Sequence, residues 1–197
     1  MKKIVLIVTD ASPLITLAVA GELDVLLLPR LRVIVPDMVQ FEVVRHADKP
    51  GARETMSWIK EHEGKDLVIG KTQEYEDFKI LYKHNPNTRT RNRGEQAAAE
   101  ILVAELKNDL EAAILLFEDS DIKKANFLVR LPDNVLVMST STYLDGLQRA
   151  ELIASADNIL KRAIEVRGRE VNNRTIQAMT GAEEMVDTWE TSFKSQG

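Results

Sequence analysis

The 197-residue chain contains no cysteine, which removes several kinds of chemistry at once. It can form no disulfide, no thiolate zinc site and no cysteine nucleophile. A chain without disulfides suits a reducing compartment, so the expected location is the cytoplasm. No run approaches the roughly 18 consecutive apolar residues of a membrane-spanning helix, so no membrane partner is expected.

Several catalytic signatures are missing too. The sequence has neither of the glycine-rich phosphate loops G-x-x-x-x-G-K and G-x-G-x-x-G, and it lacks the G-x-S-x-G turn of serine hydrolases. Its three histidines, His46, His62 and His84, show no metal-ligand spacing. The remaining candidates for chemistry are carboxylates and basic side chains.

What the chain does have is enough apolar residues, 44% of the total, for one sizeable core. We predict a main domain over residues 1–154. The pattern changes character after it, and we predict a C-terminal helical extension over residues 155–197. The net charge of -5 argues mildly against a protein that coats nucleic acid, but it does not exclude an enzyme that acts on it.

Short apolar runs without polar alternation, which are typical of strands buried on both faces, recur along the main domain. They are Ile4–Val8, Val33–Val35, Ala113–Phe117 and Asn134–Met138, with Leu67–Ile69 as a weaker edge strand. Helical patterns separate them: one capped by Ser12, then Asp37–Ala47, Ala52–His62, Gln73–Tyr82, Glu95–Lys107, Ser120–Leu128 and Thr140–Ala150. This order predicts an α/β fold whose parallel sheet is flanked by helices on both faces. The extension reads as two further helices, Asp157–Val166 and Ile176–Trp189.

Four of these segments meet a carboxylate where the chain leaves its apolar core. Asp10 follows the first strand, and Asp119 follows Ala113–Phe117. Glu42 borders the buried face of its helix, and Glu95 opens an alanine-rich helix. Ligands gather beyond the carboxyl ends of parallel strands, so we expect Asp10, Glu95 and Asp119 to converge there, with Glu42 close behind. Such a concentration of negative charge is unfavourable unless a cation neutralises it, which predicts a divalent-metal site.

Each acid also has an ordinary structural interpretation, which the sequence leaves open. Asp10, Asp119 and Asp121 could cap or begin the helix that follows each of them. Glu42 could form a salt bridge within its helix. Glu95 carries a favourable charge at the positive end of a helix. Together, however, these residues offer the all-oxygen environment that suits Mg²⁺ or Mn²⁺.

A basic stretch precedes the alanine-rich helix. From Lys79 to Arg93 the sequence contains no acid and includes Lys79, Lys83, Arg89, Arg91 and Arg93. Such a stretch can face phosphates. The turn-forming residues 85–88 make a solvated loop an equal alternative.

This constellation resembles the PIN-domain family of metal-dependent nucleases, which includes the VapC-type toxins of bacterial toxin–antitoxin pairs. Four short segments carry the resemblance in family order: Val8–Ile15, Pro36–Glu42, Gly94–Glu95 and Leu115–Asp121. Their order and spacing extend the resemblance over about residues 4 to 150.

The resemblance implies a Mg²⁺- or Mn²⁺-dependent endoribonuclease in which one or two ions activate water for attack on an RNA phosphodiester. The catalytic acids would be Asp10, Glu42, Glu95 and Asp119. The metal ligands would be Asp10, Glu95 and Asp119, with Asp121 as an additional or substitute ligand. Ser12 would help to position Asp10 or a water, and the RNA backbone would be held by Arg89, Arg91 and Arg93.

The resemblance also suggests partners. Besides RNA, these are an antitoxin protein and a second copy of the chain in a symmetric homodimer. Apolar residues of the extension should be buried, across that two-fold axis or on their own domain: Ile176, Met179, Met185, Val186 and Trp189. The competing class is a PIN-like binding or regulatory module with little turnover.

Overall fold

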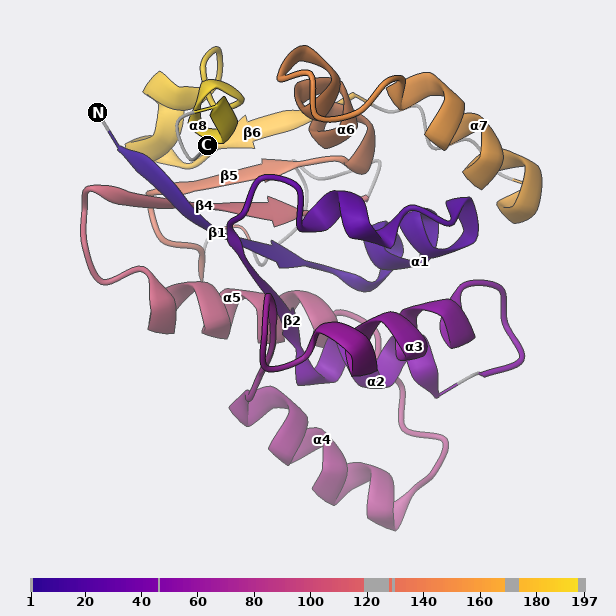
Figure 1. Cartoon of the computed structure of the whole chain (residues 1–197). Coiled ribbons are helices and arrows are strands. Elements are labelled where there is room, and N and C mark those ends of the chain that lie inside the picture. Colours follow the sequence, from indigo (N-terminus) through magenta and orange to yellow (C-terminus); the bar gives the residue numbers. More distant parts are fainter. Residues whose placement is uncertain (1, 46, 119–127, 129, 169–173, 195–197) are drawn as a thin grey trace.

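The computed structural model describes residues 2–45, 47–118, 128, 130–168 and 174–194. Within them the chain forms a six-stranded sheet of order β3-β2-β1-β4-β5-β6 (Figure 1). The strands β1 to β5 are parallel, and β6 runs antiparallel to β5. Their bounds are β1 Lys3–Thr9, β2 Arg32–Pro36, β3 Leu67–Gly70, β4 Glu111–Leu116, β5 Val135–Met138 and β6 Ile176–Ala178. The predicted α/β fold is confirmed, and β3 lies at an edge of the sheet as expected.

Helices connect the strands and cover the sheet. They are α1 Ala11–Ala20, η1 Leu23–Leu26, α2 Asp37–Val44, α3 Ala52–His62, α4 Gln73–His84, α5 Arg93–Glu105, α6 Thr140–Arg149, α7 Ala156–Arg167, η4 Thr180–Met185 and α8 Thr191–Lys194. The cap predicted at Ser12 is wrong, because α1 begins one residue earlier with Asp10 in the N-cap position. The predicted helix over Ser120–Leu128 falls almost wholly outside the described residues. None of the helices described is long and apolar enough to cross a membrane.

The order of the strands creates a switch point between β1 and β4. From β1 the chain moves outward through β2 to β3 and then returns to the other side of β1 for β4 and β5. The last pair in register is Thr9 with Leu116, and the backbone N–H of Asp10 donates to the carbonyl of Leu116 at 3.0 Å. In open parallel sheets, ligands bind in the crevice outside the carboxyl ends at such a point.

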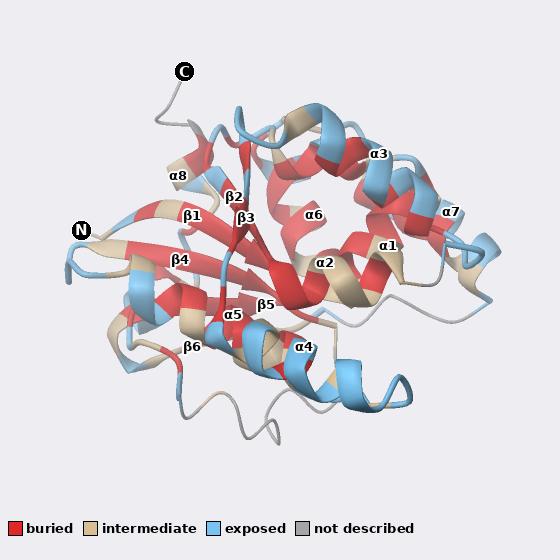
Figure 2. Cartoon of the chain, turned by 90° about the horizontal axis from the view of Figure 1, so that it is seen from below, coloured by how far each residue is buried: buried red, intermediate tan, exposed pale blue. Residues whose placement is uncertain are grey.

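The two faces of the sheet bury separate apolar layers. Leu6 and Val8 of β1 pack in a cluster with Leu102 of α5. Ile4 and Ile7 face the opposite layer, which includes residues of α1, α3, α6 and α7. A register shift between β1 and β4 lies between Ile4 and Leu6, which explains how residues three apart share one face. Figure 2 shows the strands buried between these layers.

The predicted helix over Ile176–Trp189 is wrong. The chain instead adds β6 beside β5, with Met138 opposite Ile176, and continues through the 3-10 helix η4. Trp189 is buried against α6, where a Cβ at Gly146 would collide with its ring. Residues after 154 thus contribute β6, α7 and the buried aromatic side chains of Trp189 and Phe193 to the same core. The position of the domain boundary itself stays a prediction.

Helix α4 lies farthest from the sheet (Figure 1). It is attached through buried Phe78, which packs with Met38 of α2 and Ala97 of α5. Much of its remaining surface is exposed (Figure 2), and the exposed side chains include Ile80 and Leu81. The predicted basic stretch, Lys79 to Arg93, covers the second half of α4 and its connection to α5.

Candidate active site

Asp10 stands at the switch point, directly after β1 and at the first turn of α1. Loss of hydration, with the charges of Glu95 and Glu118 adding to it, raises the pKa of Asp10 to about 7. The backbone N–H groups of Ala11 and Ser12 favour the ionised form, although neither makes a full capping hydrogen bond. The surroundings of Asp10 therefore disfavour its charge at neutral pH.

The carboxylate of Glu42, from α2, meets that of Asp10 at Gly94 in the first turn of α5. A Cβ built on Gly94 would lie 2.9 Å from Asp10 Oδ1 and 2.9 Å from Glu42 Oε2. Both distances are shorter than real Cβ contacts allow. The absent side chain of Gly94 thus leaves the space into which the two carboxylates project.

Glu42 is destabilised as an anion in the same way. Burial, followed by the charges of Asp10 and Glu95, raises the pKa of Glu42 to about 8. The hydroxyl of Thr90 donates to this carboxylate, and Arg45 lies near enough to favour its charge, but both effects are outweighed. Thr90 belongs to the basic stretch, so that stretch touches the acidic cluster directly.

The structure thus brings three predicted acids together: Asp10, Glu42 and Glu95. Glu95 lies in the first turn of α5, and its charge acts on both of the others. Asp119 and Asp121 lie outside the described residues. Among the residues that are described, no group of three or more histidine or carboxylate side chains is already arranged to hold a metal ion. The fit to a divalent cation therefore rests on the two carboxylates that share the space at Gly94.

A fourth acid, Glu118, belongs to this edge and was not singled out from the sequence. Its Oε2 accepts from Thr16 Oγ1 at 2.9 Å and from Arg167 Nη1 at 3.0 Å, and its Oε1 accepts from Thr140. The side chains of Glu118 and Arg167 are only 7% and 8% exposed. Glu118 directly follows the apolar run of β4, and the sequence alone does not say that its side chain turns inward.

Residues 6–78 of the chain match a family model described as a PIN domain. The matched segment runs from β1 into α4 and contains Asp10 and Glu42. No curated protein matches the chain closely enough to be counted as a relative. The match supports a nuclease-type, hydrolytic function.

The predicted RNA-binding arginines occupy different surroundings. Arg89 and Arg91 are exposed in the segment between α4 and α5. Arg93, at the start of α5, forms a half-buried ion pair with Glu74, and its guanidinium lies 5.4 Å from the ring centre of Phe78. Arg89 and Arg91 are thus better placed than Arg93 to meet a phosphate.

Two further features adjoin the cluster. The backbone carbonyl of Ser12 accepts a hydrogen bond from Arg167 Nη1 at 3.4 Å. The guanidinium of Arg45 lies 5.5 Å from the ring centre of Phe41 and 5.9 Å from that of Tyr82. The cation whose charge acts on Glu42 is thus flanked by two aromatic rings. Sequence spacing gave no signal for this pairing, because Arg45 and Tyr82 lie on different helices.

Proposed function

We propose that this protein is a Mg²⁺- or Mn²⁺-dependent endoribonuclease. The observation that carries the proposal is the pair of carboxylates from Asp10 and Glu42 that share the space at Gly94. Their pKa values are raised to about 7 and about 8, which marks a place where the protein gathers carboxylates and compensates their charge only in part. PIN domains typically use divalent metals, and carboxylate oxygens are the ligands that such hard cations prefer.

Asp10 and Glu42 would hold the ion, with Glu95 beside them and Asp119 and Asp121 as further predicted ligands. When bound, a divalent cation neutralises developing charge and makes water a better nucleophile. The protein's own groups set the geometry around it. Thr90 orients Glu42, and the first amides of α1 face Asp10.

An RNA strand would approach over the segment between α4 and α5. Arg89 and Arg91 provide exposed positive charge there, and Thr90 between them contacts the acidic cluster. Charge on this segment would hold the phosphate backbone without selecting a base sequence. This arrangement would place a bound phosphodiester next to Glu42.

Cleavage of a mixed RNA pool tests the proposal. The wild type should cut RNA when Mg²⁺ or Mn²⁺ is added and should be inactive in EDTA. Asp10→Asn should remain folded and lose activity by about 100-fold or more, because it removes one of the two charges at Gly94. A wild type that ignores the metal, or an Asp10→Asn variant that cuts normally, would reject the proposal.

One observation favours the alternative of a binding module with little turnover: the described residues contain no complete metal-ligand group. In that case the wild type should bind RNA or a protein without cutting RNA at any metal concentration. Quantitative binding beside a sensitive cleavage assay separates the two functions.

A role as the toxin of a toxin–antitoxin pair, with a homodimeric state, extends the same proposal. Expression of the wild type should then arrest growth, and expression of Asp10→Asn should not. Light scattering at micromolar concentration tests the dimer, and a monomeric full-length chain would reject it.

A further inference from the structure

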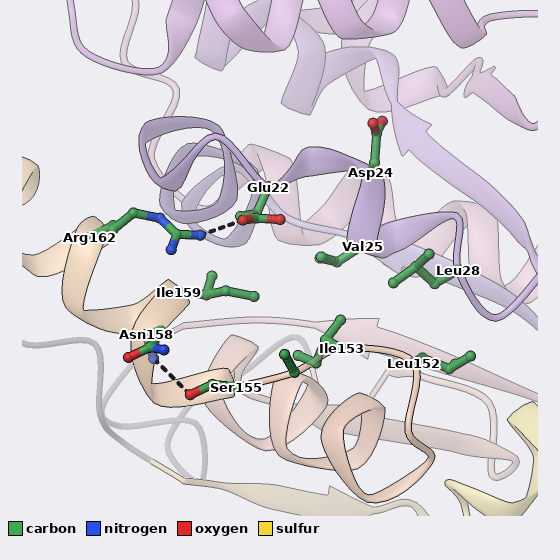
Figure 3. A pocket seen from close by; sticks show the side chains of 11 residues that line it. Glu22, Asp24, Val25, Leu28, Leu152, Ile153, Ser155, Asn158, Ile159 and Arg162 are labelled. Carbon is green, nitrogen blue, oxygen red and sulfur yellow. Dashed lines mark hydrogen bonds and ion pairs between the residues drawn. The ribbon is translucent and has the colours of Figure 1, made fainter.

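Two arginines of α7, Arg162 and Arg167, form hydrogen bonds to opposite ends of α1. At the end of α1 that is remote from Asp10, Arg162 donates to the carbonyl of Ala20 at 3.1 Å and pairs with Glu22. This pair borders a pocket of about 380 Å³ between η1 and the segment that joins α6 to α7 (Figure 3). At the other end, Arg167 reaches the first turns of α1 and the end of β4. One helix thus carries matched contacts at both ends of α1.

The two contacts differ in burial. The side chains of Arg162 and Glu22 are 45% and 36% exposed, so water screens their interaction. Arg167 and Glu118 are almost fully buried. Removing one member of a buried pair leaves the other charge without compensation, whereas an exposed pair can be lost at little cost.

Within the part of the chain that the structure describes, three hydrogen bonds of Arg167 converge on a single nitrogen. Its Nη1 donates to the carbonyl of Ser12, to the hydroxyl of Thr16 and to the carboxylate of Glu118. Thr16 in turn donates to Glu118 Oε2, so the arginine, the threonine and the carboxylate form a closed triangle. Arg167 therefore links the first turns of α1 to Glu118, which lies two residues after the end of β4.

Glu118 is held in place on both of its oxygens, since Thr140 of α6 binds Oε1 while Thr16 and Arg167 bind Oε2. Its charge also acts on Asp10. A carboxylate with this many donors is suited to shape the site beside Asp10 from a fixed position.

We propose that Arg167 is a positioning residue for the carboxylate site: it fixes Glu118 and the first turn of α1, and through them the placement of Asp10. The inference rests on the proposed function for its activity readout. It assigns the end of α7, which lies beyond the predicted main domain, a part in the site.

The test compares Arg167→Gln with Arg162→Gln. The two variants remove the same charge from the same helix and its contact with α1, so both report any general loosening of α7. Arg167→Gln should lower kcat for RNA cleavage by about 10- to 100-fold, as removal of a group that orients a metal-site residue commonly does. The KM for RNA should be unchanged, because the substrate-facing residues are intact. Arg162→Gln should keep wild-type kcat.

A second readout is independent of activity. The rise in melting temperature caused by Mn²⁺ should be reduced in Arg167→Gln and retained in Arg162→Gln. Arg167→Lys should recover part of the loss, because a lysine ammonium supplies one nitrogen with several donors, as Nη1 does here. If Arg167→Gln fails to fold, Thr140→Val removes a different contact of Glu118 and should lower kcat and the Mn²⁺ response in the same direction.

The outcomes separate this inference from the proposed function. A wild type that responds to Mn²⁺ but cuts no RNA rejects the nuclease, while a weaker response in Arg167→Gln alone still supports the positioning role. Equal kcat and equal Mn²⁺ response in Arg167→Gln and Arg162→Gln overturn the inference and leave the nuclease intact. A wild type with neither response removes the site and rejects both.

Discussion

The carboxyl edge of the sheet holds two kinds of carboxylate. On the side of β4, α6 and α7, Glu118 is surrounded by two threonines and Arg167, which satisfy it as an anion. On the side of α2 and α5, Asp10 and Glu42 crowd one space, and their pKa values are raised to about 7 and about 8. The protein surrounds Glu118 with donors, whereas it compensates Asp10 and Glu42 only in part, as expected where a ligand would supply the remainder.

The largest effect on stability should follow from breaking the compensated side. Glu118→Gln removes the charge that Arg167 meets in the interior, and the free energy of unfolding should fall by about 3 kcal/mol or more. Urea denaturation measures it. Glu22→Gln is the matched control, because it breaks the exposed ion pair with Arg162, which lies on α7 like Arg167. This variant should lower the free energy of unfolding by about 1 kcal/mol or less. Equal losses would remove the distinction between the two contacts.

A smaller loss of stability is expected when a side chain fills the space at Gly94 that Asp10 and Glu42 share. Gly94→Ala puts a methyl group against the oxygens of Asp10 and Glu42, and we expect a loss of about 1–3 kcal/mol together with loss of the Mn²⁺ response. Val103→Ile adds a methyl group to the exposed side of the same helix and should change neither quantity. A Gly94→Ala variant with normal Mn²⁺ binding would show that the carboxylates do not share this space with an ion.

The two sides of the carboxyl edge also show which features could be predicted from the sequence and which could not. Strands buried on both faces are continuous apolar runs, so the sheet and the edge that carries Asp10 could be predicted. The glycine space at Gly94 could not, because it depends on how closely α5 approaches α1 and α2. Glu118 was missed for a related reason: whether its side chain turns inward depends on where β4 ends.

The C-terminal region shows the limit most clearly. The three-residue strand β6 is too short to display a period of two, and its apolar residues, with those of η4, fit a helical spacing equally well. Contacts such as Trp189 with Gly146 and Arg167 with Glu118 join segments far apart in the chain. No local pattern predicts them.

The pH dependence of stability should differ between the two sides. Without metal, Asp10 and Glu42 have pKa values in the folded state above those of the unfolded chain, so the folded state binds more protons between about pH 4 and 8. Their contribution is therefore present at low pH and is lost as pH rises through about 7 to 8. We expect a loss on the order of 1–2 kcal/mol from pH 5 to 8.5, a value that allows for their partial exposure.

Glu42→Gln isolates this contribution. Denaturation in EDTA at each pH should show a shallower decline for the variant than for the wild type, since one of the titrating groups is gone. Parallel profiles for the two proteins would mean that Glu42 carries its charge in the folded state at neutral pH without penalty.

The smallest effect concerns the basic segment that borders the side of Asp10 and Glu42. Arg91→Ala should weaken RNA binding by a similar factor for every sequence and reduce the slope of log affinity against log salt by about 1. Lys107→Ala, which removes an exposed charge after the far end of α5, should leave the slope unchanged. An unaltered slope in Arg91→Ala would place the RNA elsewhere on the surface.

The measurement that tests the central claim most directly is the melting temperature of the wild type and of Asp10→Asn during a titration with Mn²⁺. A cation held by Asp10 and Glu42 stabilises only the folded state, by about 2.7 kcal/mol at a hundredfold excess over its Kd, so the wild type should melt several degrees higher. Asp10→Asn should show no rise. An unchanged melting temperature in the wild type, or the same rise in both proteins, would contradict the assignment of this site.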